Sequence, residues 1–80
     1  MSPTIFREKG YRFFFFSNEN NEPAHIHVEK DDKYGKIWLD NIDIAKNYGF
    51  SAKEINNILH IINIKKSDFI RSWNEYFTNK

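Results

Sequence analysis

Cysteine is absent from the 80 residues, so disulfide bonds and zinc sites built on thiolates are excluded. An excess of charge of one sign is also lacking, because 12 Lys and Arg face 11 Asp and Glu, which leaves a formal net charge of +1. This balance removes any general attraction to nucleic acid or membrane, so a contact with RNA would need a local basic patch.

Long hydrophobic runs are missing as well. The longest, Phe13–Phe16, is far too short to span a bilayer. The first residues also lack the apolar core of a signal peptide. Together with the absence of cysteine, these features predict a cytoplasmic protein that does not contact a membrane. The frequent Asn, Lys and Ile residues suggest an AT-rich bacterial genome.

Aromatic residues are abundant instead: eight Phe, four Tyr and two Trp. The length predicts a single domain over residues 1–80, and a chain this short buries only about 60–65% of its unfolded surface. Each buried aromatic side chain removes roughly 150–250 Å² from water. Aromatic packing must therefore supply much of the stability, and some of the rings are candidates for an interface with a second chain.

Alternation of polar and apolar residues predicts strands near 11–17, 25–30 and 36–40. Residues 42–45 are a weaker candidate for a fourth strand. In the second strand the alternation turns Ile26 and Val28 toward the core. It turns three polar residues toward the opposite face, which we expect to be exposed to solvent: His25, His27 and Glu29. Two stretches are expected to be irregular: residues 1–10 and the polar loop 17–24.

A helical region follows from residue 51 to 78. Ser51 and Glu54 have the spacing of a capping box, which marks a helix start. Two apolar stripes at helical spacing come next: Ile55, Ile58, Leu59 and Ile62, then Phe69, Ile70, Trp73 and Phe77. One long helix fits, but Asn63 and Ser67 can each cap a new helix, so two helices over 51–62 and 64–78 are favoured. The predicted fold class is α+β, a small antiparallel sheet of three to four strands followed by one or two C-terminal helices.

The pair His25 and His27 is the one constellation that suggests chemistry. Side chains two apart on a strand point the same way, with Cβ atoms about 7 Å apart. Two imidazoles so placed suit acid and base catalysis on a phosphodiester, with Arg12 or Lys30 neutralising the phosphate. The competing interpretation is that both histidines simply line the wet face of the sheet.

A metal site ranks below these two interpretations. Glu29 continues the face of the histidines, but it lies about 13 Å from His25 along a regular strand. A third ligand would have to come from Asp40, from His60 or from a second chain. Since two ligands are too few for a tight site, no metal and no cofactor are expected.

Several stretches resemble a small bacterial family catalogued as domain of unknown function 4160. They are the start Met1–Ile5, the segment Pro23–Val28 with its two histidines, the strand containing Gly35, and a helix ending near Trp73. Ala24 and Ile26 stand where the family usually has a proline and an aromatic residue.

The resemblance implies a component of a toxin–antitoxin-like module of two proteins. The expected partner is thus a small antitoxin-like or toxin-like protein, and action on RNA through the histidine strand would make the chain an enzyme. The alternative is a non-catalytic module that binds a protein or a second copy of itself.

Overall fold

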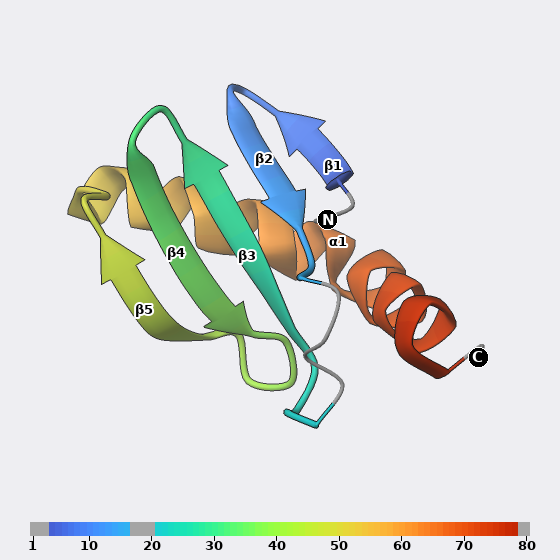
Figure 1. Cartoon of the computed structure of the whole chain (residues 1–80). Helices are drawn as coiled ribbons and strands as arrows, with labels where there is room; N and C mark the ends of the chain where they lie inside the picture. Colours follow the sequence, from blue (N-terminus) through green and yellow to red (C-terminus); the bar gives the residue numbers. More distant parts are fainter. Residues whose placement is uncertain (1–3, 17–20, 79–80) are drawn as a thin grey trace.

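A computed structural model describes residues 4–16 and 21–78 (Figure 1). Five strands form one antiparallel sheet in the order β1-β2-β3-β4-β5, and a single helix follows. The elements are β1 (Thr4–Glu8), β2 (Tyr11–Phe14), β3 (His25–Lys30), β4 (Lys33–Trp38), β5 (Asp43–Tyr48) and α1 (Ala52–Thr78). The α+β class is confirmed, but the sheet has five strands rather than three to four.

The additional strand is β1, in a stretch predicted to be irregular. Lys9 and Gly10 both have positive φ, 53° and 84°, and join β1 to β2 as a two-residue hairpin loop. Positive φ at both positions matches the twist of the flanking strands. Gly10 therefore turns a hairpin, whereas the prediction treated it as the end of an irregular segment. Residues 1–3 of that segment lie outside the described residues.

The other strand predictions hold with shifted bounds. β2 ends at Phe14, short of the predicted 11–17, and β3 coincides with 25–30. β4 begins at Lys33 and ends at Trp38, so it overlaps 36–40 only in part. The fourth-strand candidate is confirmed as β5. The predicted loop 17–24 falls partly outside the described residues, at 17–20.

One continuous helix replaces the two that were favoured. The capping box is present: the Ser51 amide donates to Glu54 Oε1 at 2.9 Å, and the Glu54 amide donates to Ser51 Oγ at 3.2 Å. Neither Asn63 nor Ser67 interrupts the helix. Two lysines between them contact the sheet region, Lys65 over the Phe6 ring at 4.8 Å and Lys66 Nζ donating to the Asp40 carbonyl at 2.7 Å.

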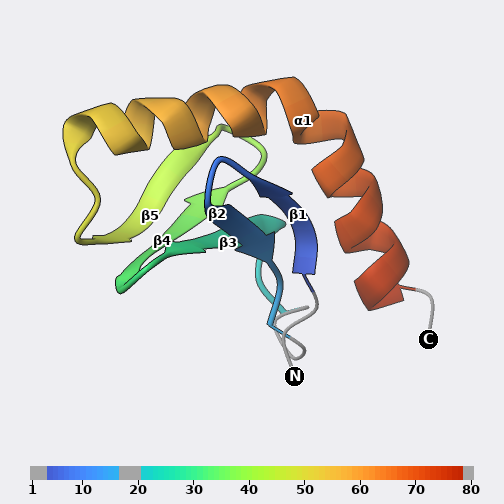
Figure 2. The ribbon, with the colours of Figure 1, turned by 90° about the horizontal axis from the view of Figure 1, so that it is seen from above.

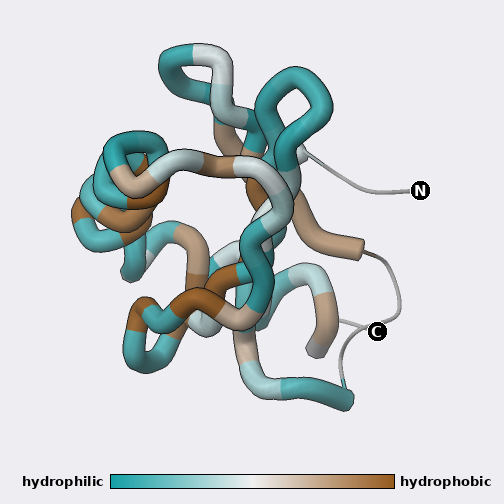
Figure 3. The backbone as a smooth tube through the Cα atoms, turned by 90° about the vertical axis from the view of Figure 1, so that its left-hand side faces the viewer, coloured by the Kyte–Doolittle hydropathy of each residue, from teal (hydrophilic) through white to brown (hydrophobic). Residues whose placement is uncertain are grey.

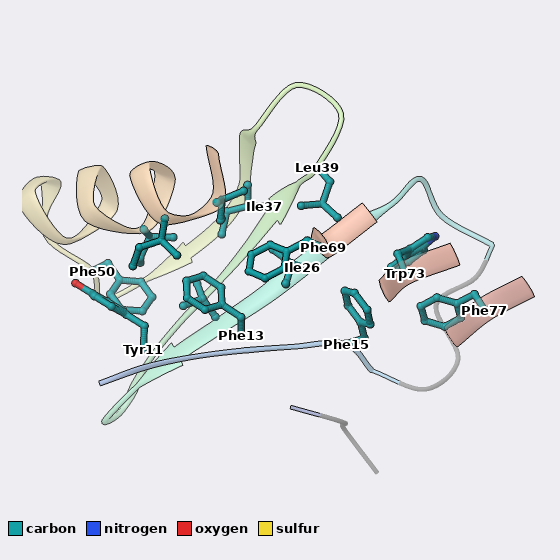
Figure 4. Close-up of a cluster of buried hydrophobic side chains, with 14 residues drawn as sticks. Tyr11, Phe13, Phe15, Ile26, Ile37, Leu39, Phe50, Phe69, Trp73 and Phe77 are labelled. Atoms are coloured by element: carbon teal, nitrogen blue, oxygen red, sulfur yellow. The ribbon is translucent and has the colours of Figure 1, made fainter. Parts of the chain in front are cut away.

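The core lies between the sheet and α1. Figure 4 shows Phe13, Ile26 and Ile37 of the sheet facing the helix. Figure 2 shows the first half of α1 crossing over the sheet and the second half bending past β1. In Figure 3 the helix alternates between hydrophilic and hydrophobic segments, as expected when one side is buried. The most buried helix residues include Ile58, Ile62, Phe69, Trp73 and Phe77.

Candidate functional site

The sheet face opposite the one that packs on the first half of α1 is called the open face here. Residues directly opposite each other in the sheet point to the same side. Phe14 pairs with His27, Arg12 with Glu29, and His25 with Trp38, so these side chains share one face. The predicted division of β3 is confirmed, with Ile26 and Val28 in the core and the histidines on the other side. The open face also carries Tyr34, Lys36 and, from β5, Asp43, Lys46 and Tyr48.

The histidines are buried, which corrects the expectation of a wet face. His25 is 0% exposed and His27 is 1% exposed. Their rings lie 5.0 Å apart and perpendicular. Residues far away in sequence cover them, because Trp73 of α1 lies 4.8 Å from the His25 ring and Phe16 lies 4.4 Å from the His27 ring.

His25 is anchored by the segment that precedes β3. Its Nδ1 lies 2.9 Å from the Pro23 carbonyl oxygen and 3.8 Å from Glu22 Oε1. Since a carbonyl only accepts, Nδ1 carries the proton in this hydrogen bond. The Trp38 ring meets the His25 ring edge-on at 5.5 Å. The imidazole is thus held in one orientation by a backbone hydrogen bond and two indole rings.

His27 belongs to a row of stacked rings that crosses four strands. Its ring lies 5.4 Å from Phe14 and 5.7 Å from Tyr34, both nearly parallel, and its Nδ1 is 2.6 Å from the Tyr34 hydroxyl oxygen. Tyr34 in turn stacks on Tyr48 at 5.9 Å. We call Phe14, His27, Tyr34 and Tyr48 the aromatic ladder. It runs from β2, where it is buried, to β5, where Tyr48 is 59% exposed.

Two cations on the open face, Arg12 and Lys36, are paired with carboxylates. Arg12 Nη1 lies 3.0 Å from Glu29 Oε2, and the guanidinium sits 4.3 Å above the Phe14 ring. Lys36 Nζ lies 2.7 Å from Glu22 Oε1 and 4.6 Å from the centre of the Trp38 ring. The two carboxylates therefore offset two cations that lie on the same face as the histidines.

The two predicted phosphate-binding residues lie on different faces. Arg12 lies on the histidine face. Lys30 follows Ile26 and Val28 on the helix side, where its Nζ lies 4.8 Å from the centre of the Tyr11 ring. The structure therefore brings His25, His27 and Arg12 together but separates Lys30 from them.

The suggested additional metal ligands do not join the histidines. Across residues 4–16 and 21–78 no three His, Cys, Asp or Glu side chains are grouped closely enough to hold a metal ion. Asp40 and His60 are both exposed. The same part of the chain forms no pocket, so the imidazoles are packed side chains without an adjoining cavity. No helix within these ranges has the length and apolar character to cross a membrane.

A family model described as domain of unknown function (DUF4160) matches residues 10–74, which include β2 to β5 and most of α1. The chain belongs to the DUF4160 family. The resemblance noted from the sequence is confirmed, and the matched segment contains both histidines and the whole aromatic ladder. Searches of curated proteins and of solved structures each found no match for this DUF4160 chain.

Sequence reasoning missed most of the ladder in this DUF4160 protein. It did not place any phenylalanine beside the histidines, although Phe14 and Phe16 contact His27 on the open face. It gave no role to Tyr34, Trp38 or Tyr48. A signal was available, because Tyr34, Lys36 and Trp38 alternate at period two, the spacing of one strand face.

Proposed function

We propose that this DUF4160 protein is a non-catalytic binding module that recognises a small partner protein through the exposed end of its open face. The observation that carries the proposal is Tyr48, which is 59% exposed although the ladder beneath it is packed. A ring held by stacked neighbours loses little conformational freedom on binding, so it suits an interface anchor.

The composition of the open face favours a protein over RNA. Exposed or half-buried aromatic side chains lie beside arginine, the mixture that is typical of binding hot spots. Negative charges are interspersed, whereas a surface for RNA would offer an excess of unpaired cations. Charged residues assigned to this face include Arg7, Arg12, Lys36 and Lys46, with Glu22, Glu29 and Asp43.

The burial of the histidines supports a structural role for them. A general acid or base must reach its proton at about 2.6–3.2 Å, or through one water. His25 and His27 are 0% and 1% exposed, and both Nδ1 atoms are engaged within the chain. Catalysis on RNA would require Phe16 and Trp73 to move away from the rings. The hypothesis that the chain cuts RNA stays a prediction for experiment.

The expected context is a toxin–antitoxin-like module, in which the partner is the product of a neighbouring gene. The test is calorimetric titration of that product into the purified protein. Tyr48→Ser should weaken binding at least tenfold, because it removes the exposed anchor. The matched control is Ile64→Ser on α1, where an apolar side chain that is 64% exposed is removed outside the open face. Equal affinities for all three proteins would overturn the proposal.

A second experiment addresses the RNA hypothesis directly. The wild type and His27→Phe are expressed without the partner, and cell growth and RNA integrity are followed. His27→Phe keeps a planar ring in the ladder but removes the titratable nitrogen atoms, so the fold should survive while acid–base catalysis does not. If the protein is a non-catalytic binding module, RNA should stay intact in both cultures. RNA cleavage by the wild type that His27→Phe abolishes would favour the enzyme instead.

A further inference from the structure

The outer edge of β5 is the least covered part of the sheet. β5 is the last strand in the sheet order and pairs only with β4 among the described strands. Five of its six residues are exposed. Figure 1 places β5 at the left margin of the sheet, with α1 behind it rather than alongside its edge. Such an edge presents backbone N–H and C=O groups that can pair with another strand.

A bulge gives this edge an unusual distribution of charge. Asp43 pairs with Trp38 and Lys46 pairs with Lys36, and the register shifts between the two pairs. Residues three apart in a regular strand point to opposite faces. The bulge instead directs Asp43 and Lys46 to the same side, the open face.

Both charges on the edge are available to a partner. Asp43 and Lys46 are exposed, and neither forms an ion pair or a hydrogen bond with its side chain within the described part of the chain. Lys46 also lies opposite Lys36, a like charge that Glu22 offsets at 2.7 Å. A carboxylate supplied from outside would therefore be favourable next to Lys46.

We propose that β5 pairs antiparallel with β5 of a second copy of this chain, joining two sheets into one. With the two-fold axis between Ile44 and Ala45, Asp43 of each copy lies opposite Lys46 of the other. The same register places Ile44, which is 40% exposed, opposite Ala45 on the helix side of the sheet. Residues 43–46 read acid, apolar, apolar, base. An antiparallel copy presents them in the opposite order, so each acid meets a base and each apolar residue meets an apolar residue, and a two-fold interface requires such self-complementarity.

A lysine and a bulge on an edge strand ordinarily discourage pairing. Here both features serve the same contact. The bulge aligns Asp43 with Lys46 on one face, and the lysine meets a carboxylate in this register. The proposal is independent of the partner-binding role of Tyr48, since Tyr48 lies beyond the two paired charges and its ring stays on the open face.

The experiment measures dimer dissociation by sedimentation equilibrium from micromolar to millimolar protein at low salt. The wild type should dimerise, and Lys46→Asp and Asp43→Lys should each raise the dissociation constant about tenfold or more, because each places like charges opposite each other twice. The double variant, Asp43→Lys with Lys46→Asp, should restore dimerisation. Lys53→Asp makes the same charge change on the exposed side of α1 and should have no effect.

Amide NMR shifts that depend on concentration locate the contact. Under the proposal they concentrate at residues 43–48, and circular dichroism confirms that each variant is folded. A wild type that stays monomeric at millimolar concentration would overturn the proposal. So would a dimer whose shifts lie elsewhere, or single variants that weaken the dimer without rescue in the double variant.

Discussion

On the helix side of the sheet, Phe13, Ile26 and Ile37 pack against α1 through hydrocarbon and aromatic contacts. On the open face, His27 is buried just as deeply, but its neighbours are other rings, a hydroxyl group and paired charges. The helix side is stabilised by the hydrophobic effect, which scales with the apolar area removed from water and has no directional preference. The open face depends on ring orientation and hydrogen bonds, so it specifies geometry more narrowly.

The largest expected effect comes from weakening the helix side. Phe69 of α1 is 1% exposed, with its ring 5.5 Å from that of Phe13. Phe69→Ala should lower the free energy of unfolding by about 3–5 kcal/mol, because it leaves a cavity in the core. Urea titration followed by circular dichroism measures the change. Ile64→Ala on the same helix, at a side chain 64% exposed, should cost less than about 0.5 kcal/mol. Similar losses in both variants would contradict this placement of the core.

The second prediction tests whether the open face is a packed layer. His27→Ala removes a ring that contacts Phe14, Phe16 and Tyr34. It should lower the free energy of unfolding by about 2–4 kcal/mol, somewhat less than the core variant. His60→Ala on the exposed side of α1 is the matched control and should change little. If both histidine variants are equally mild, the open face does not contribute to stability as its packing implies.

A smaller effect should separate ring stacking from hydrogen bonding within the ladder. Tyr34→Phe keeps the ring but removes the hydroxyl that lies 2.6 Å from His27 Nδ1. The expected cost is about 1 kcal/mol. Tyr48→Phe removes a hydroxyl from the same ladder where the ring is 59% exposed, and should be nearly neutral. His27→Phe removes the other partner of the hydrogen bond with Tyr34. The double variant, Tyr34→Phe with His27→Phe, should therefore be destabilised by less than the sum of the two single variants, because the same hydrogen bond is lost in each. Fully additive losses in the free energy of unfolding would argue against a direct hydrogen bond.

The smallest expected effect is a dependence of stability on pH at the start of α1. The hydrogen bond from the Lys33 ammonium, followed by that from the Ser51 amide, lowers the pKa of Glu54 from 4.5 to about 2. A carboxyl whose pKa is lower in the folded state stabilises the fold above its ordinary pKa, and this stabilisation is lost as the pH falls from about 4.5 toward 2.

When the free energy of unfolding is measured as the pH falls through that window, it should decrease less for Glu54→Gln than for the wild type. Glu75→Gln, an exposed site on the same helix, should follow the wild type. Because the Lys33–Glu54 pair is near the surface, the difference should be small and should shrink in salt. Parallel curves for the two glutamate variants would show that Glu54 gains no special stabilisation from its contacts.

The local sequence pattern was sufficient to predict the structure where one face of a strand or helix packs on the core. The alternation of Ile26 and Val28 with the histidines, and the reciprocal hydrogen bonds of Ser51 and Glu54, were predicted correctly. β1 was missed because the Lys9–Gly10 turn depends on positive φ at both residues, which the composition of the segment does not reveal. The catalytic role of His25 and His27 and the contribution of Arg12 remain predictions.

By itself, the sequence determined which side of β3 and which stripe of α1 are apolar, where the helix begins and the family to which the chain belongs, because these depend on residues close together in the chain. Only the tertiary structure decided what covers each side. The helix continues past Asn63 and Ser67 while Lys65 and Lys66 contact the β1 and β4 regions of the fold. The histidines are shielded from solvent because Phe16 and Trp73 cover them. The periodicity of β3 cannot predict this burial, because it depends on contacts with segments outside β3.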